Sequence, residues 1–420
     1  MVRVLKSRRY PEFTKKMKED YTIVAPTMLP IHFKIISKLL GEYGYNLEFF
    51  EGDSQTALKE GLKTVHNDIC YPAMIVIGQL IHAIKSGKYD KNKTAFIITQ
   101  TGGGCRASNY IHLLRKALKD NGFSSVPVIS LNGSGLESHS GFKLSPILLL
   151  KLVNVMFYGD ALMYISNQCK SYEKVKGSTI KVVDKWIDII AEKSKDISVF
   201  KSDKIYKLML SDFSRIELIK EEKIKVGIVG EIYMKYSPLG NNKLEEFLQN
   251  EGCEVVMSGV CDFFMYCLAN SQVDNKLYGM NKKSKNITRI GYNYLVIQQK
   301  KMIKAIIKYS DFKAPTKFET VRSYAKGYIN EGVKMGEGWL MTAEMLELIK
   351  DGVNNIVCAQ PFGCLPNHIV GRGMVRKIMS TYKNANIVAI DYDPSGTKVN
   401  QENRIKLMLS NAKMNKVLDV

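Results

Sequence analysis

Cysteines in three loops are the residues of this sequence best suited to chemistry. Each loop precedes a helical segment and carries glycine or proline near its cysteine. The loops read DICYP around Cys70, QTGGGCR around Cys105, and CAQPFGCLPNH from Cys358 through Cys364. A thiol at a helix N-terminus has a lowered pKa, because the positive end of the helix dipole favours the thiolate. Arg106, directly after Cys105, is expected to lower the thiol pKa further.

Thiolates in loops of this kind suit an iron–sulfur cluster. They ligate the iron, backbone N–H groups of glycine-rich loops can bond the sulfides, and helix N-termini offset the cluster's negative charge. The candidate metal ligands are therefore Cys70, Cys105, Cys364 and Cys358. The candidate cofactor-binding residues beside them are Gly102, Gly103, Gly104 and Arg106.

Other interpretations of these thiols remain open at this stage. The four candidate cysteines could bind zinc, although the paired Cys-x-x-Cys spacing of zinc sites is missing. Cys364 and His368 could form a nucleophile–base pair, but no third group is evident to orient the histidine. Each cysteine could also be a small buried hydrophobe, which is the expectation for Cys169, Cys253 and Cys267. Cys261, after a strand, stays a weaker candidate ligand.

Alternating strand and helix patterns surround these loops. Short apolar runs predict strands at 21–28, 45–50, 93–99, 126–131, 225–229, 254–258, 355–359 and 386–391. Helical periodicity follows most of them. This alternation predicts an α/β protein with two doubly wound, parallel-sheet domains of the flavodoxin-like kind and helical insertions. Ligands of such sheets gather at the carboxyl ends of the strands, where the cysteine loops lie.

The chain of 420 residues is long enough for more than one domain. We expect a first α/β domain over 1–144, a helical bridge over 145–222, and a second α/β domain over 223–420 with a helical insertion at 262–341. No phosphate-binding Gly-x-x-x-x-Gly-Lys-Ser/Thr loop is present, so the chain is not expected to hydrolyse ATP itself.

Charge and hydropathy limit the class of protein. The net charge is +20, but the lysines are dispersed and no nucleic-acid motif accompanies them, so we expect no nucleic-acid partner. The excess of positive charge could instead favour an acidic electron donor or the phosphates of coenzyme A.

The basic N-terminus lacks the apolar stretch of a signal peptide. The most apolar run, 144–165, contains Lys151, Asn154 and Asp160, which predicts a buried helix and not a membrane span. We expect a cytoplasmic protein.

The same motifs resemble the 2-hydroxyacyl-CoA dehydratase family. They are most similar to the branch found as the C-terminal part of acyl-CoA dehydratase activase-related proteins. The resemblance rests on DICYP, on GGGCR with the following helix and VPVISLN strand, and on QPFGCLPNHIVGRG around Cys364. It extends into NIVAIDYDPSGTKVNQENRIKLM at 386–408 and covers both α/β regions.

The resemblance implies two flavodoxin-like domains with a [4Fe-4S] cluster between them, ligated by cysteines of both. Cys70 and Cys105 match the two ligands of the first domain, and Cys364 best matches that of the second. Cys358 is either a fourth ligand or a buried thiol at a strand end. In the dehydratase branch an ATP-hydrolysing activator injects one electron, the cluster passes it to a thioester carbonyl, and the ketyl radical expels a β-hydroxyl.

The resemblance also implies partners. Related members reduce aromatic acyl-CoA esters, or carry a double-cubane [8Fe-9S] cluster and reduce small molecules. That cluster should need six thiolates, whereas four are well placed here. The dehydratase has two homologous subunits, which implies a homo- or heterodimer, and the activator domains of the large relatives are missing from this chain. We therefore expect an iron–sulfur reductase or electron-transfer subunit with a separate ATP-hydrolysing activator; a non-catalytic scaffold with structural cysteines or zinc is the alternative.

Overall fold

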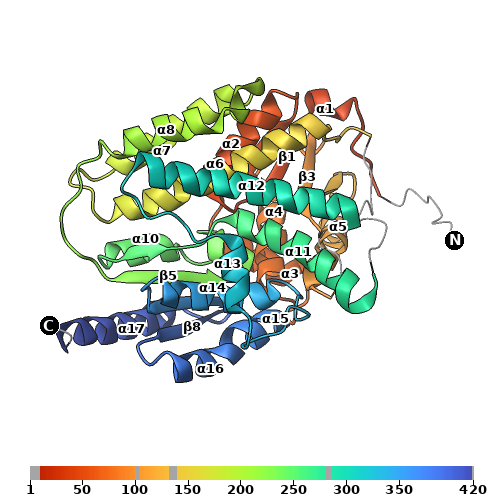
Figure 1. Ribbon diagram of the computed structural model, residues 1–420. Coiled ribbons are helices and arrows are strands. Elements are labelled where there is room, and N and C mark those ends of the chain that lie inside the picture. The colour runs from red at the N-terminus through yellow and green to blue at the C-terminus, as the bar shows by residue number, and fades with distance from the viewer. Residues whose placement is uncertain (1–9, 101–103, 132–139, 281–284, 419–420) are drawn as a thin grey trace. The chain divides into compact units, whose positions relative to one another are not determined.

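The chain forms two compact units, each built around one sheet (Figure 1). The structure is a computed structural model that describes residues 10–100, 104–131, 140–280 and 285–418. Unit 1 comprises Met1–Met28 and Ser37–Pro146, and unit 2 comprises Leu29–Ile36 and Ile147–Val420. Each sheet has four strands, all parallel, and helices flank it. The predicted α/β class with two flavodoxin-like parallel sheets is therefore confirmed.

Unit 1 carries the sheet order β2-β1-β3-β4. Its strands are β1 (Thr22–Pro26), β2 (Asn46–Phe50), β3 (Thr94–Thr99) and β4 (Val128–Leu131). Its helices are α1 (Met17–Asp20), the Ser37–Gly41 part of α2 (Pro30–Gly41), α3 (Ser54–Thr64), α4 (Tyr71–Lys85), the 3-10 turn η1 (Arg106–Asn109) and α5 (Tyr110–Asp120). The helix α3 was not expected from the sequence.

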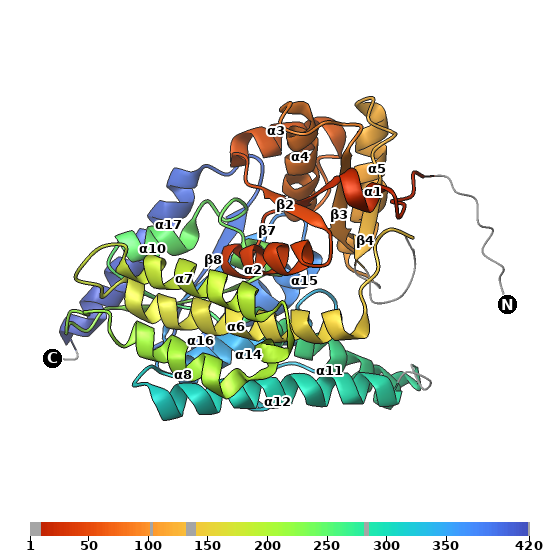
Figure 2. The ribbon, with the colours of Figure 1, turned by 90° about the horizontal axis from the view of Figure 1, so that it is seen from above.

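Helices α3 and α4 of unit 1 pack backbone to backbone. Figure 2 shows α3, α4 and α5 together beside the sheet. A Cβ at Gly78 would lie 1.8 Å from the carbonyl oxygen of Ala57, and one at Gly61 would lie 2.2 Å from that of Met74. No side chain fits at such distances. The two glycines therefore allow α3 to support α4, the helix that begins after Cys70.

Unit 2 carries the sheet order β6-β5-β7-β8. Its strands are β5 (Lys225–Gly230), β6 (Glu254–Val256), β7 (Asn355–Pro361) and β8 (Asn386–Tyr392). Its helices after the Leu29–Ile36 segment are α6 (Pro146–Lys170, from Ile147), α7 (Ser178–Lys193), η2 (Ile197–Phe200), α8 (Ser202–Phe213), α9 (Ile232–Tyr236), α10 (Leu244–Asn250), α11 (Val260–Tyr278), α12 (Lys285–Tyr309), α13 (Phe318–Tyr324), α14 (Gly338–Lys350), α15 (Leu365–Asn367), the π-helical turn η3 (His368–Arg372), α16 (Gly373–Thr381) and α17 (Lys398–Leu418).

The central strands of unit 2 are buried almost throughout. In β5 and β7 every residue after the first is buried, as expected of parallel strands covered on both faces. The apolar core beside them includes Val229, Met341, Ile356 and Val370. Because continuous apolar runs mark such strands, the sequence placed all eight strands of the two sheets correctly, to within a few residues at their ends.

The helix α6 is apolar enough and long enough to cross a bilayer, but it lies mostly inside unit 2. Its polar residues are satisfied there: Lys151 donates to the carbonyl oxygens of Ser194 and Lys195, and Asn154 donates to the Tyr294 hydroxyl at 2.9 Å. Both views show α6 alongside α7, α8 and α12 (Figures 1 and 2). The prediction of a buried helix is confirmed.

The division of the chain differs from the expected one in two respects. The helices expected as a separate bridge over 145–222 are part of unit 2, because α6 supplies Asp160 to the N-terminus of α11 within that unit. The segment Leu29–Ile36 also belongs to unit 2, since His32 hydrogen-bonds to Asp160 at 2.9 Å. A contact between residues 128 positions apart leaves no local sequence signal.

Candidate functional site

Cys70 lies at the start of α4 in unit 1. It occupies the N-cap position with extended backbone angles, and Pro72 is in the first turn of the helix, as expected. Its side chain is buried, and its Sγ lies 2.9 Å from the Tyr110 hydroxyl. The carbonyl oxygen of Cys70 accepts from the N–H groups of Ala73, at 3.0 Å, and Met74, at 3.4 Å, in the first turn of α4. The thiol of Cys70 is therefore held next to the positive end of the helix dipole.

Cys105 has the same kind of position in unit 1. It is the N-cap residue of η1, which continues directly into α5. Its side chain is partly exposed, and Arg106 beside it is exposed. Gly104 is exposed as well, whereas Gly102 and Gly103 lie outside the described residues. The expectation that these two glycines approach a cofactor stays a prediction.

Two hydrogen bonds bring the loops of Cys70 and Cys105 together within unit 1. The Arg106 guanidinium donates to the carbonyl oxygen of Asp68, two residues before Cys70. Tyr110, the first residue of α5, contacts the Cys70 thiol. The two loops are more than thirty residues apart in the sequence. They lie at the same edge of the sheet, because strand β3 runs parallel to its neighbours and ends there. Unit 1 therefore presents two thiols from adjacent loops, both at helix N-termini and with an arginine beside them.

Cys364 follows β7 in unit 2 and is the N-cap residue of α15. Its Sγ accepts a hydrogen bond from Nδ2 of Asn367 at 3.1 Å. Asn367 is fully buried, and the same Nδ2 donates to Oε2 of Glu337 at 3.2 Å. The next residues form the π-helical turn η3, a geometry that is often found at functional sites. The loop thus holds its thiol in a polar environment that includes a carboxyl group.

A second carboxyl group completes this environment. Glu231 follows β5 and caps α9, where its Oε2 accepts from the Met234 N–H at 2.9 Å. Oε1 of Glu337 accepts from the neighbouring Ile232 N–H, also at 2.9 Å. Burial, and then repulsion from Glu337, raises the pKa of Glu231 to about 8, and burial raises the pKa of Glu337.

These two carboxyl groups act on the thiol of Cys364. Burial, followed by repulsion from Glu337 and Glu231, raises the pKa of the Cys364 thiol far above its usual range. With no cation bound, the Cys364 thiol therefore keeps its proton near neutral pH. A bound cation would favour the thiolate, because it would offset the same repulsion. The sequence did not identify Glu231, Glu337 or Asn367; the only signal was the position of Glu337 between two glycines before a helix.

Cys358 lies inside β7 and not in the loop. Its side chain is fully buried in the apolar core with Met341, Ile356 and Val370. Burial, and then the charge of Asp391, raises the pKa of its thiol to about 12. Of the two interpretations given for Cys358, the buried thiol of a strand describes this position.

Of the remaining cysteines, Cys169 and Cys253 have the burial expected of structural residues, and Cys267 does not. Cys169 and Cys253 are buried, whereas Cys267 is exposed on α11. Cys261 is also buried, and its N–H donates to Asp160, which caps α11. Among the described residues, no three histidine, cysteine, aspartate or glutamate side chains form a group that could hold a metal ion.

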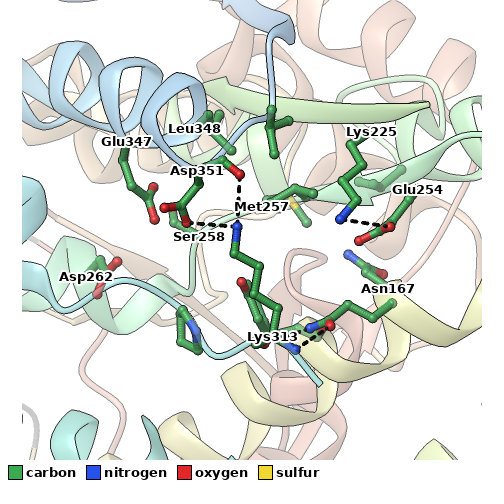
Figure 3. Close-up of a pocket in the computed structure, with 16 residues that line it drawn as sticks. Asn167, Lys225, Glu254, Met257, Ser258, Asp262, Lys313, Glu347, Leu348 and Asp351 are labelled. Carbon is green, nitrogen blue, oxygen red and sulfur yellow. Dashed lines mark hydrogen bonds and ion pairs between the residues drawn. The ribbon is translucent and has the colours of Figure 1, made fainter. Parts of the chain in front are cut away.

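A polar pocket lies beside the edge strand β6 of unit 2 (Figure 3). It contains two ion pairs, Lys225 with Glu254 at 3.7 Å and Lys313 with Asp351 at 3.4 Å. Burial, and then repulsion from Glu344, raises the pKa of Glu347 in its wall to about 8. The cavity volume is ≈ 30 Å³. That is room for about two water molecules, so this pocket is too small for an organic substrate.

A buried ion pair lies near this pocket. Nζ of Lys235 on α9 is 2.9 Å and 3.1 Å from the carboxylate oxygens of Glu344 on α14, and the Ser258 hydroxyl contacts both groups. Lys235 and Glu344 are both more than nine-tenths buried. Sequence reasoning missed this pair because its members are 109 residues apart.

Comparison with known proteins adds no family to these observations. No family model matches the chain, and no curated protein is significantly similar to it. The fold is established as two flavodoxin-like parallel-sheet units, and any family assignment rests on the three cysteine motifs.

Proposed function

We propose that this chain is an iron–sulfur reductase or electron-transfer subunit. In this proposal Cys70 and Cys105 are cluster ligands of unit 1, and Cys364 is the ligand of unit 2. The observation that carries the proposal is the pair of thiols in unit 1, which come from adjacent loops and both cap helices. We leave Cys358 out of the ligand set, because it is enclosed in the apolar core of β7.

The residues present are chemically suited to such a cluster. Thiolates bind iron, and the N–H groups at the starts of α4 and η1 can offset the negative charge of a cluster. Arg106 adds a positive charge, and the Asn367 amide donates to the Cys364 sulfur, which tunes a cluster's potential. A [4Fe-4S] cluster supplies single-electron transfer, and the double-cubane [8Fe-9S] type is the alternative cofactor.

The electron source and acceptor follow from the resemblance to 2-hydroxyacyl-CoA dehydratases. We propose a separate ATP-hydrolysing activator as the electron donor, an acyl-CoA ester or another small molecule as the acceptor, a dimeric assembly and a cytoplasmic location. The small cavity beside β6 does not serve as the substrate site in this proposal, because an acyl group exceeds its volume.

Anaerobic purification followed by iron and sulfide analysis tests the proposal. We expect bound iron and sulfide, and an EPR signal after reduction. Cys105→Ala should lose most of the iron, whereas the matched control Cys169→Ala, a buried thiol on α6, should retain it. A protein that contains no iron after anoxic reconstitution would contradict the proposal, and zinc in its place would favour a structural zinc site.

Equal loss of iron from Cys105→Ala and Cys169→Ala would show that the ligands are assigned incorrectly. Circular dichroism of both variants separates loss of metal from loss of fold. The electron donor can be tested separately: an ATP-hydrolysing activator should reduce the protein, and raised salt should slow this reduction if the net charge of +20 guides docking.

A further inference from the structure

An open groove separates α16 from the edge strand β8 in unit 2. The two elements lie side by side (Figure 1), and Nη1 of Arg372 is 3.2 Å from Oδ2 of Asp391 on β8. The cavity volume of the groove is ≈ 530 Å³. Its lining residues are Arg372, Val375, Arg376, Met379, Ser380 and Ala389. The groove is therefore wide enough for a peptide segment, in contrast to the small pocket beside β6.

The helical wall of the groove is basic and apolar. Arg376 and Ser380 are four residues apart and so share one face of α16, and Arg372, the last residue of η3, precedes Arg376 by four residues. Arg376 is exposed to solvent, and so is Arg372, which is paired with Asp391. Val375 and Met379 add apolar surface beside them. This wall is complementary to a ligand that combines negative charge with apolar side chains.

The strand wall of the groove presents backbone hydrogen-bonding groups. β8 is the last strand of its sheet, and in the described residues it pairs with β7 only. The Asn386 N–H and the Tyr392 carbonyl both bond toward β7, so residues 386, 388, 390 and 392 face that strand. The backbone groups of Ile387 and Ala389 therefore point to the open edge. The Asp391 carbonyl, on the same side, accepts from Gln401 Nε2 at 3.1 Å.

We propose that this groove binds an extended acidic segment of a partner protein, which adds a strand beside β8. An added strand would satisfy the backbone groups of Ile387 and Ala389, and its acidic side chains would pair with Arg372 and Arg376. Charge selects this occupant over a second copy of the chain. Two copies paired edge to edge would bring the arginines of both grooves together in a protein of net charge +20. This proposal does not depend on whether the chain holds a cluster.

Binding of synthetic peptides tests the proposal. The probes are peptides of about eight residues that alternate glutamate with valine, threonine or tyrosine, a common length for a strand. We expect binding by fluorescence anisotropy that weakens with salt, and slower amide hydrogen exchange at Ile387 and Ala389 in the complex. The same peptide with N-methyl groups on alternate amides should bind at least about tenfold more weakly, because it cannot pair with the edge.

Variants locate the site. Arg376→Glu should weaken binding at least about tenfold, whereas the matched control Arg404→Glu, at an exposed arginine of α17, should leave it nearly unchanged. Both variants change exposed residues, and circular dichroism checks that they fold. The proposal is overturned if none of the acidic peptides binds, if the N-methylated peptide binds equally well, or if both variants weaken binding to the same extent. Tighter binding of an oligothymidylate than of any peptide would also overturn it, in favour of a nucleic-acid groove.

Discussion

Two helix caps show how the two units treat the same motif differently. In unit 1, Asp53 caps α3 and accepts from the Thr56 N–H at 2.7 Å; in unit 2, Glu231 caps α9 and accepts from the Met234 N–H at 2.9 Å. The hydrogen bond lowers the pKa of exposed Asp53, whereas burial and Glu337 raise the pKa of Glu231. A hydrogen bond from a helix N-terminus therefore does not determine the charge of its carboxyl group; burial and neighbouring charge do.

The same contrast applies to the candidate ligands. Cys70 and Cys105 cap helices beside Arg106, and Cys364 caps a helix beside Glu231 and Glu337. The topology of the two sheets is equivalent, but unit 1 places a cation by its thiols and unit 2 places carboxyl groups. Equivalent loops of related folds can therefore place groups of opposite charge beside their thiols.

The largest expected effect concerns the ion pairs of the two units. Lys235→Met should lower the free energy of unfolding of unit 2 by about 3–5 kcal/mol, because Glu344 would be left buried without its cation. The matched change in unit 1, Lys85→Met, removes one of the two lysine partners of Glu60. It should cost about 1 kcal/mol or less, because Lys85 is more exposed than Lys235 and Lys63 still pairs with Glu60. Urea denaturation of each variant measures both; equal losses would contradict the contrast in burial.

The next effect is a dependence of stability on pH. Because the pKa of Glu231 rises from 4.5 to about 8 on folding, the folded state retains a proton that the unfolded state loses. The free energy of unfolding should therefore fall as pH rises from about 4.5 to 8, and Glu231→Gln should remove part of this fall, on the order of 1–3 kcal/mol.

The Asp53 cap of unit 1 should make stability depend on pH in the opposite direction. The lowered pKa of Asp53 stabilises the fold above the ordinary pKa of aspartate, and this contribution is lost as pH falls. Asp53→Asn should therefore lower stability at neutral pH and have less effect in acid. Urea denaturation across the pH range measures the free energy of unfolding of both variants. If the two substitutions changed its dependence on pH in the same direction, the two caps would be equivalent.

Thiol reactivity provides a smaller effect. In metal-free protein near pH 8, Cys105 should react with iodoacetamide at least about tenfold faster than Cys364, since only the thiolate is nucleophilic. Glu337→Gln should accelerate the reaction of Cys364, because it removes a neighbouring negative charge. Peptide mapping by mass spectrometry measures both rates. Faster alkylation of Cys364 than of Cys105 would reverse the comparison.

The smallest expected effect distinguishes the two cysteines of the third motif. Cys358→Ala should lower stability by about 1 kcal/mol through a small cavity in the core, and should leave the iron content unchanged. Cys364→Ala should have little effect on stability but should reduce bound iron. Iron analysis beside denaturation separates the two, and loss of iron from Cys358→Ala would restore Cys358 to the ligand set.

The sequence by itself determined the eight strands and the helix starts that carry the thiols. Apolar runs specify buried parallel strands because their side chains are covered on both faces, and the eight strands could be placed on that basis. Glycine and proline beside Cys70, Cys105 and Cys364 marked helix starts, which the structure confirms. Both features depend on residues close together in the chain.

The tertiary structure alone decided what surrounds these elements. It brings Glu337 to Cys364 through Asn367, pairs Lys235 with Glu344, and assigns His32 to unit 2 through Asp160. It also encloses Cys358 in the core, although its local sequence resembles that of a strand end. The physical reason is that burial and charge–charge repulsion depend on groups distant in sequence, whereas periodicity and helix capping are local. Charge states at the candidate site therefore followed from packing and not from motif.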